Sequence, residues 1–140
     1  MRCVILTGMS GSGKSTALKM IEDMGYYCVG NLPISLVESF VDLAENDPEL
    51  DKVAINVDIR SGQNIGDLTA VLDRLQERGK SFEMLFLESE DAVIIKRYKE
   101  TRRTHPLAEG GRVEQAIERE RERLQPIKRR ADYILDTSQL

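Results

Sequence analysis

The chain has 140 residues, of which 41% are hydrophobic and 31% charged, and its formal net charge is −4. This length and composition fit one compact domain with a sizeable core, and the negative charge argues against a general nucleic-acid binder. One histidine and two cysteines without a Cys-x-x-Cys pair cannot form a zinc site. No apolar run approaches the roughly 20 residues of a membrane span, so we expect a cytoplasmic protein.

Apolar strand-like runs alternate with amphipathic helical patterns along the whole chain. Strands are predicted at 3–7, 26–29, 53–57, 84–87 and 133–135. Helices are predicted at 14–24, 33–44, 65–75, 89–98 and 113–130, with Pro33 in the first turn of the second, Ser89 as the cap of the fourth, and Pro126 bending or breaking the last. This alternation predicts a three-layer α/β/α fold around a five-stranded parallel sheet. Right-handed crossovers then bring the C-terminal ends of all strands to one edge.

A glycine-rich segment follows the first predicted strand directly and opens the first predicted helix. It reads Gly8-Met9-Ser10-Gly11-Ser12-Gly13-Lys14-Ser15 and satisfies the pattern G-x-x-x-x-G-K-[ST] in full. Its glycines allow positive φ, so that successive N–H groups form a nest for anions at the start of a helix. Lys14 is expected to reach the β- and γ-phosphates and Ser15 to coordinate Mg²⁺, with Thr16 the last contact in this segment. This context predicts a P-loop that binds a purine nucleoside triphosphate, ATP or GTP.

Asp58 ends the third predicted strand, at the sheet edge where the glycine-rich segment is expected. A carboxylate there could hold Mg²⁺ or its water shell. The alternative is an ordinary strand-terminal acid that faces solvent. Because Mg²⁺ needs a carboxylate nearby, the glycine-rich segment favours the metal role.

An irregular, arginine-rich segment at 102–112 is predicted to form a lid. Arg102 and Arg103 are assigned to stabilising the charge that develops on a transferred phosphoryl group. The alternative is a solvated basic surface, and Arg97 and Arg112 flank the segment with the same two alternatives. The predicted catalytic residues are Lys14, Asp58, Arg102 and Arg103.

Several further segments are more specific than the glycine-rich loop. They are Glu22-Asp23-Met24-Gly25-Tyr26-Tyr27-Cys28-Val29, Asn31-Leu32-Pro33, Asp58-Ile59-Arg60, Thr101-Arg102-Arg103-Thr104-His105-Pro106-Leu107, Arg130-Ala131-Asp132 and Leu135-Asp136-Thr137-Ser138. Together with the loop they resemble the amino-terminal half of the RapZ/YvcJ family of nucleotide-binding proteins. The resemblance covers nearly the whole chain.

The resemblance implies binding and hydrolysis of both ATP and GTP, with a guanine-nucleotide motif on Asp58, Ile59, Arg60 and Ser61. Some members of the family are adapters that deliver a small regulatory RNA to an RNase, which ties amino-sugar synthesis to RNA decay, and others are linked to natural competence. Family members carry a second domain, which holds the RNA-binding function of the adapters. We therefore expect residues 1–140 to be the amino-terminal half of a longer protein and to bind RNA weakly or not at all by themselves. The oligomeric state stays open.

Two positions depart from the family pattern, since Gly30 replaces an Asp and Ser61 replaces a common Asn. The main alternative function is a small-molecule kinase that transfers the γ-phosphate of ATP to a hydroxyl or phosphate acceptor, because such kinases share the loop, the strand-end Asp and the arginine-rich lid. Another alternative is an interaction module with a vestigial loop. After Val29 only Gly30 and Asn31 could fix an acceptor, which favours a regulatory domain with weak ATPase and GTPase activity.

Overall fold

A five-stranded sheet in the order β2-β3-β1-β4-β5 forms the middle layer of the fold, and every pair of neighbours is parallel. The computed structural model describes residues 1–59, 64–101 and 113–138. Its strands are β1 (Arg2–Gly8), β2 (Tyr27–Pro33), β3 (Lys52–Asp58), β4 (Glu83–Glu88) and β5 (Tyr133–Asp136). The central strand β1 pairs with β3 and β4, so whatever follows Gly8 emerges at the middle of the sheet edge.

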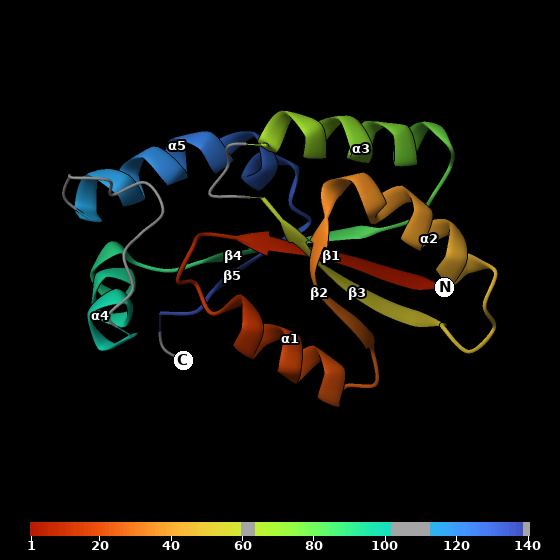
Figure 1. Cartoon of the computed structure of the whole chain (residues 1–140), viewed down its shortest axis with the longest axis horizontal. Helices are drawn as coiled ribbons and strands as arrows, with labels where there is room; N and C mark the ends of the chain where they lie inside the picture. Colours follow the sequence, from red (N-terminus) through yellow and green to blue (C-terminus); the bar gives the residue numbers. More distant parts are fainter. Residues whose placement is uncertain (60–63, 102–112, 139–140) are drawn as a thin grey trace.

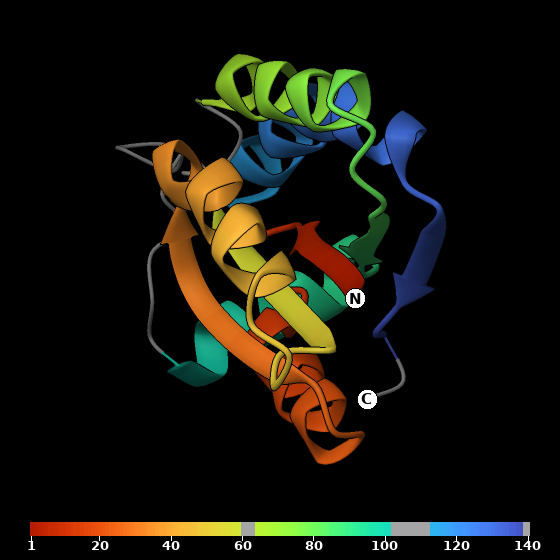
Figure 2. The ribbon, with the colours of Figure 1, turned by 90° about the vertical axis from the view of Figure 1, so that its right-hand side faces the viewer.

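Helices cover both faces of the sheet. They are α1 (Lys14–Asp23), α2 (Val37–Glu45), α3 (Ile65–Glu77), α4 (Asp91–Thr101) and α5 (Val113–Arg130), with the short turn η1 (Ile34–Leu36) before α2. Figures 1 and 2 show α2, α3 and α5 on one face and α1 on the other, while α4 lies at the end of the sheet where the loop before α1 emerges. The predicted α/β/α fold with a five-stranded parallel sheet is therefore confirmed.

Two groups of buried apolar side chains hold the layers together. The larger joins the sheet to α2, α3 and α5 through residues such as Ile5, Val41, Leu72, Phe86 and Leu124. The smaller consists of Leu6, Ala17 and Leu87 and seats α1 on the opposite face. Because α1 begins at Lys14, this second group also fixes the C-terminal end of the glycine-rich loop.

Strand β2 is longer than the sequence predicts. It continues past Val29 to Pro33, with a register shift between Val29 and Leu32 and a positive φ of 50° at Asn31. Pro33 pairs with Asp58 and precedes η1, so it ends a strand rather than lying in the first turn of a helix. An edge strand accepts such a bulge and a proline, because its outer side makes no ladder hydrogen bonds.

Two predictions about helix ends are corrected. The amides of Val93 and Ile94 donate to the Glu90 carbonyl oxygen, so Glu90 rather than Ser89 caps α4. Helix α5 continues through Pro126, so of the two predicted effects of this proline, bending or breaking, the break is wrong. Both Pro126 and Glu122, whose carbonyl loses its donor to the proline, are exposed, so water can satisfy that carbonyl. The predicted lid at 102–112 lies outside the described residues.

Candidate functional site

The glycine-rich loop joins the central strand β1 to α1, and its glycines are needed by the backbone. A Cβ on Gly8 would lie 2.4 Å from the carbonyl oxygen of Leu87, so only glycine lets the end of β1 approach β4 this closely. Gly11 and Gly13 have φ of 78° and 86°, which is the left-handed region that glycine adopts without strain. Each glycine of the sequence pattern therefore has a structural reason.

Some polar groups of the loop bond to one another or to β4, whereas amides at the start of α1 have no acceptor among the described residues. The Met9 amide donates to the Leu87 carbonyl over 3.2 Å, and the amide and hydroxyl of Ser12 donate to the Met9 carbonyl. Within the described ranges, no residue accepts a hydrogen bond from the N–H of Gly13, Ser15 or Thr16. Amides at a helix N-terminus, together with the positive end of the helix dipole, bind anions.

Lys14 is the first residue of α1 and folds back across the loop. Its Nζ donates to the carbonyl oxygen of Gly8 over 3.3 Å. The ammonium therefore lies at the β1 end of the loop, while Ser15 and Thr16 are exposed on the first turn of α1. This arrangement surrounds the candidate phosphate site with donors from both ends of the loop.

Two residues distant in sequence hold the outer carbonyl groups of the loop. Arg97 of α4 donates from Nη1 to the Gly11 carbonyl and from Nη2 to the Thr137 carbonyl, each over 2.7 Å. The hydroxyl of Thr137, just beyond β5, donates to the Ser12 carbonyl over 2.5 Å. Because the loop carbonyls are bound from outside, the loop is fixed before any ligand arrives. Arg97 thus supports the loop backbone, which differs from the lid role considered for it.

A buried carboxylate lies against the tip of the loop. Glu120 of α5 is fully buried and accepts the amide of Ser10 over 2.8 Å and the hydroxyl of Ser10 over 2.5 Å. A charged group this deep must be hydrogen-bonded to be tolerated. Glu120 was not among the residues predicted from the sequence.

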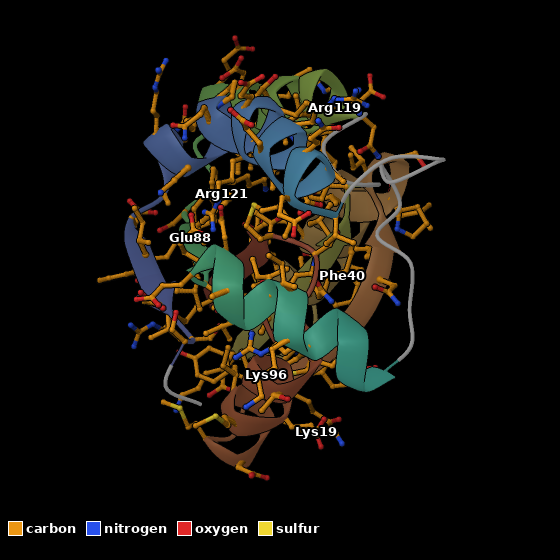
Figure 3. The ribbon with its side chains drawn as sticks, turned by 90° about the vertical axis from the view of Figure 1, so that its left-hand side faces the viewer. Lys19, Phe40, Glu88, Lys96, Arg119 and Arg121 are labelled. Atoms are coloured by element: carbon orange, nitrogen blue, oxygen red, sulfur yellow. The ribbon has the colours of Figure 1, made fainter. Side chains whose placement is uncertain are left out.

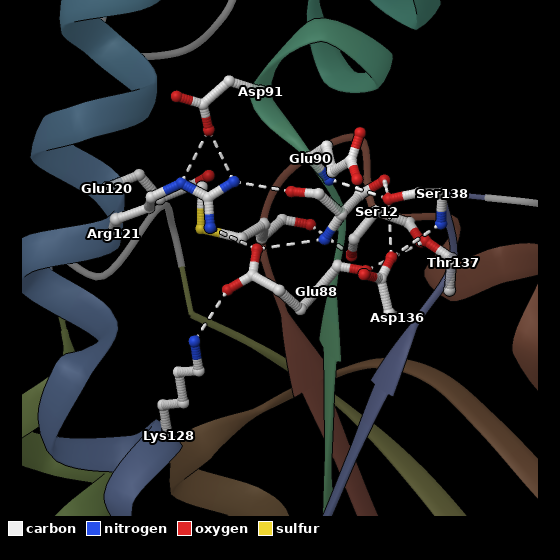
Figure 4. A network of polar contacts seen from close by, with 12 residues as sticks. Ser12, Glu88, Glu90, Asp91, Glu120, Arg121, Lys128, Asp136, Thr137 and Ser138 are labelled. Atoms are coloured by element: carbon white, nitrogen blue, oxygen red, sulfur yellow. Dashed lines mark hydrogen bonds and ion pairs between the residues drawn. The ribbon is translucent and has the colours of Figure 1, made fainter.

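The residue after Glu120 ties α5 to the junction between β4 and α4. Arg121 bonds to Asp91 over 2.6 Å, to the Ser89 carbonyl over 2.5 Å and to Glu88, and Lys128 pairs with the other oxygen of Glu88. Figure 4 shows these contacts beside Ser12 and Thr137, and Figure 3 places Arg121 and Glu88 between α5 and α4. Burial acts against the charged guanidinium, but the hydrogen bonds that it donates to Asp91 and Glu88 outweigh burial and raise the pKa of Arg121.

The predicted site residues fall into two groups. The loop residues Gly8, Met9, Ser10, Gly11, Ser12, Gly13, Lys14, Ser15 and Thr16 are brought together at the sheet edge. Asp58 ends the neighbouring strand β3 at the same edge, but its side chain lies outside the described part. Ile59 is only 3% exposed and packs in the larger core, so it could reach a ligand only through its backbone. Arg60, Ser61, Arg102 and Arg103 lie outside the described residues.

The described side chains contain no cluster of three His, Cys, Asp or Glu residues that could hold a metal ion. The Mg²⁺ prediction therefore depends on the Ser15 hydroxyl, which is exposed at the start of α1, and on Asp58. A serine hydroxyl and a carboxylate are oxygen ligands, which fit Mg²⁺. In the described part of the chain no helix is both long and apolar enough to cross a membrane.

Three residues that contact the loop were not among the predicted site residues: Arg97, Glu120 and Thr137. For Glu120 there was a usable signal, because it shares the apolar side of α5 with Ala116 and Leu124. A glutamate among buried positions of a helix indicates a specific partner. Arg97 and Thr137 gave no such signal, because nothing local marks a partner that is 86 or 125 residues away.

Comparisons with known proteins agree with this geometry. The RapZ-like N-terminal domain family matches residues 1–140. A protein from Agathobacter rectalis named nucleotide-binding protein is 52% identical over 141 residues, and the match covers 100% of this chain and 48% of the relative. A protein of the same name from Lachnoclostridium phytofermentans is also 52% identical, with 100% of this chain and 50% of the relative covered. The chain thus spans about half the length of the curated relatives it matches.

Solved structures share the fold at low sequence identity. Shikimate kinase from Acinetobacter baumannii in complex with shikimate has a TM-score of 0.63 at 16% identity, with 99% of this chain and 84% of that chain covered. Shikimate kinase from Bacteroides thetaiotaomicron has a TM-score of 0.60 at 15% identity, with 96% and 86% covered. At this identity the likeness shows the P-loop, kinase-like fold and nothing about substrates.

Proposed function

Since this chain belongs to the RapZ-like N-terminal domain family, we propose that residues 1–140 form a regulatory P-loop domain that binds ATP or GTP with Mg²⁺ and hydrolyses it slowly. One observation carries the proposal: the carbonyl groups of Gly11 and Ser12 are bound by residues from outside the loop. Within the described residues the amides of Gly13, Ser15 and Thr16 have no acceptor, and the Lys14 ammonium lies at the β1 end of the loop. Relatives named nucleotide-binding proteins support it.

The phosphates are bound by the loop and by Lys14. The amides of Gly13, Ser15 and Thr16 donate to phosphate oxygens, and the Lys14 ammonium neutralises the β- and γ-phosphates. Ser15 and Asp58 are the proposed ligands of Mg²⁺, because β3 is the neighbour of β1 and ends at the same edge. When bound, the ion would offset the negative charge of the phosphate oxygens.

The remaining proposed roles belong to Asp58 and Ile59 and to four residues outside the described ranges. Asp58, Ile59, Arg60 and Ser61 form the proposed guanine-nucleotide segment, to which Ile59 contributes through its backbone because its side chain is buried. Arg102 and Arg103, in the proposed lid at 102–112, stabilise charge on the transferred phosphoryl group.

Slow hydrolysis fits the outer end of β2. Gly30 is exposed and brings no carboxylate that could position a water molecule or an acceptor. Without such a group, transfer of the γ-phosphate to a small-molecule acceptor is the less favoured function. The experiment below tests for this transfer as well.

We extend the proposal to the full-length protein, of which this chain would be the nucleotide-binding half. The curated relatives are about twice as long as this chain, and the resemblance to RNase adapters supports a contact with a regulatory RNA and an RNase through the remaining half. The net charge of −4 is in keeping with weak or absent RNA binding by residues 1–140 alone.

The proposal is tested by measuring phosphate release from ATP, GTP and CTP, with and without Mg²⁺ and with and without candidate hydroxyl acceptors. We expect slow, Mg²⁺-dependent release from ATP and GTP that acceptors do not change. Stoichiometric phosphorylation of an acceptor would instead identify a kinase. The variant Asp58→Asn should weaken Mg²⁺-dependent binding and hydrolysis more than it weakens nucleotide binding without Mg²⁺. Equal losses with and without Mg²⁺ would assign Asp58 another role.

A further inference from the structure

We propose that the part of the sheet face beside α1 that no described helix covers is the docking surface of an amphipathic helix, and that this helix belongs to the segment following Leu140 in the full-length protein. This surface, the open face, consists of Tyr133 and Leu135 of β5, Leu85 of β4, and Met20 and Met24 of α1. The inference rests on the part of the proposed function that makes this chain the amino-terminal half of a longer protein, and it does not depend on nucleotide binding.

The register of the sheet places apolar side chains of β4 and β5 on the same face as α1. Leu87 of β4 packs with Ala17 of α1 and so points to that face, and Leu85 packs against the same group. Tyr133 and Leu135 are the register partners of Leu85 and Leu87, and side chains paired in this way share a face. Both are exposed, so the outer strand presents two large apolar side chains to solvent beside α1.

Helix α1 lies over the other part of this face. The side chain of Leu18 reaches β2, where a Cβ on Gly30 would lie 3.9 Å from it. At about 100° per residue, Met20 lies about 160° around the helix from Leu18 and so points away from β2. Met24 follows one turn later, and both methionines are exposed. Figure 2 shows α1 below β2 and β3, with β5 to their right.

The composition of the open face is that of a contact surface. Parallel sheets are normally covered on both faces, and adjoining exposed apolar side chains mark a site of interaction. At the amino-terminal edge of the sheet the apolar side chains give way to charged ones, since Arg2 and Glu83 form an ion pair there over 3.3 Å. A partner with an apolar stripe and polar flanks fits this pattern.

The relatives and the position of the chain after β5 indicate which partner covers the open face. The matching family is that of an amino-terminal domain, and the relatives are about twice as long as this chain, so a comparable length follows the matched part. Beyond β5 the amide of Thr137 donates to the Glu88 carbonyl over 2.8 Å. The chain is therefore held beside β4 at the edge of the sheet where α1 also begins.

A helix is the element that fits the open face. About 12 helical residues span about 18 Å, which is most of the length of a seven-residue strand such as β1. Lying beside α1, such a helix would cover Leu135 together with Met20. A strand added at the outer edge of β5 would leave Met20 and Met24 in solvent, so it fits less well.

Hydroxyl-radical footprinting of the full-length protein, read by mass spectrometry, tests whether the open face is covered. Tyr133 and Tyr27 are 58% and 54% exposed in this chain, and Tyr27 lies on the opposite edge strand, so the two tyrosines are a matched pair. We expect Tyr133 to be oxidised several-fold more slowly than Tyr27, and Met20 and Met24 more slowly than Met1. Tyr133 and Met24 oxidised as fast as Tyr27 and Met1 would refute the inference.

Photocrosslinking identifies the occupant. With p-benzoylphenylalanine in place of Met24 in the full-length protein, we expect a cross-link within one chain to the segment that begins directly after Leu140. A cross-link to a second copy would identify a dimer interface, and one to a distant part of the second half would identify a contact between domains. Either result would refute the proposed occupant, as would a natural protein whose measured mass shows that it ends at Leu140.

A pair of matched variants checks the energetic contribution. Leu135→Gln should lower the unfolding temperature of the full-length protein by about 3 °C, whereas Leu43→Gln, at an exposed leucine of α2, should leave it unchanged. Equal unfolding temperatures for the two variants would contradict docking at β5. None of these measurements uses a nucleotide. An uncovered open face therefore leaves the proposed nucleotide binding intact, and a wild type that fails to bind ATP leaves this inference intact.

Discussion

Two arginines of this chain each bind two carboxylates on other elements, and they differ in how much water surrounds them. Arg121 of α5 bonds to Glu88 and Asp91, and the side chains of Arg121 and Glu88 are 26% and 15% exposed. Arg78, just after α3, bonds to Asp42 and Glu38 of α2, and its side chain and that of Asp42 are 40% and 41% exposed. The contacts of Arg121 lie beside Ser12 of the glycine-rich loop (Figure 4), whereas those of Arg78 join the end of α3 to α2.

The difference shows that ion pairs of similar composition contribute differently to the structure, depending on their exposure to solvent. Partly buried, well-aligned ion pairs fix a geometry, whereas exposed pairs are screened by solvent and salt and contribute little. We therefore expect the side of the molecule with the loop, α4, α5 and β5 to respond strongly to single substitutions, and the α2–α3 surface to tolerate them. The predictions below test that contrast.

Lys14→Ala should have the largest effect, on ligand affinity. Removing a charge that faces the phosphates should weaken ATP binding by about 100-fold, while the unfolding temperature stays nearly unchanged because Lys14 is only half-buried. Titration calorimetry with ATP measures the loss, and Lys19→Ala, an exposed lysine of the same helix, is the control. Equal affinities for Lys14→Ala and Lys19→Ala would remove Lys14 from the site.

Arg121→Met should have the largest effect on stability. It removes the hydrogen bonds to Asp91 and Glu88 and leaves two acids near each other, which should cost about 2 kcal/mol and lower the unfolding temperature by about 5 °C. The Ser10 amide should also exchange with solvent faster, because its acceptor lies on the same helix. Arg123→Met, an exposed position two residues on, is the control. The same unfolding temperature for both variants would contradict the contrast.

Thr137→Val should have a smaller effect that reaches the loop. Valine keeps the shape but cannot donate to the Ser12 carbonyl, and an unmet buried acceptor costs about 1 kcal/mol or slightly more. Thermal unfolding and an ATP titration should both register the change, since Ser12 lies in the loop. Thr69→Val, which loses a hydrogen bond within α3 only, should leave ATP affinity unchanged. A loss of ATP affinity in Thr69→Val as large as in Thr137→Val would refute the local explanation.

Arg78→Gln should have the smallest effect, and one that depends on pH. The hydrogen bond from Arg78 is the main cause that holds the pKa of Asp42 below its ordinary value of 3.8. A lowered folded-state pKa adds stability above the unfolded value and loses it as the pH falls through the folded value. The small difference in unfolding temperature between wild type and Arg78→Gln should therefore vanish in strongly acidic solution. A difference that grows there would reverse the sign of this account.

The order of strands and helices could be predicted because each element has its own local pattern. Short apolar runs, separated by amphipathic helical patterns, predicted the five strands. The segment from Gly8 to Ser15 predicted the loop between β1 and α1. The end of β2 could not be predicted, because Gly30 and Asn31 have low strand propensity. They lie in the register shift of β2, and the strand continues because Leu32 and Pro33 pair with β3 beyond it. The predicted break at Pro126 is wrong because this helix position is exposed, so that water can replace the missing hydrogen bond.

The support of the loop was largely hidden from sequence. Glu120 meets Ser10 across 110 residues, and Thr137 meets Ser12 across 125. Such contacts arise only when α5 and β5 pack against the sheet, so no local pattern specifies them. The charge of Glu120 within an apolar helix face was the single local sign of the arrangement.

The most direct test of the account follows the backbone amides of the loop by NMR during a titration with Mg²⁺-ATP. The account predicts saturable shifts of the Gly13, Ser15 and Thr16 amide resonances, while those of α2 and α3 around Asp42 and Arg78 stay in place. Saturable ATP binding that shifts the α2–α3 resonances and leaves Gly13, Ser15 and Thr16 unmoved would contradict it.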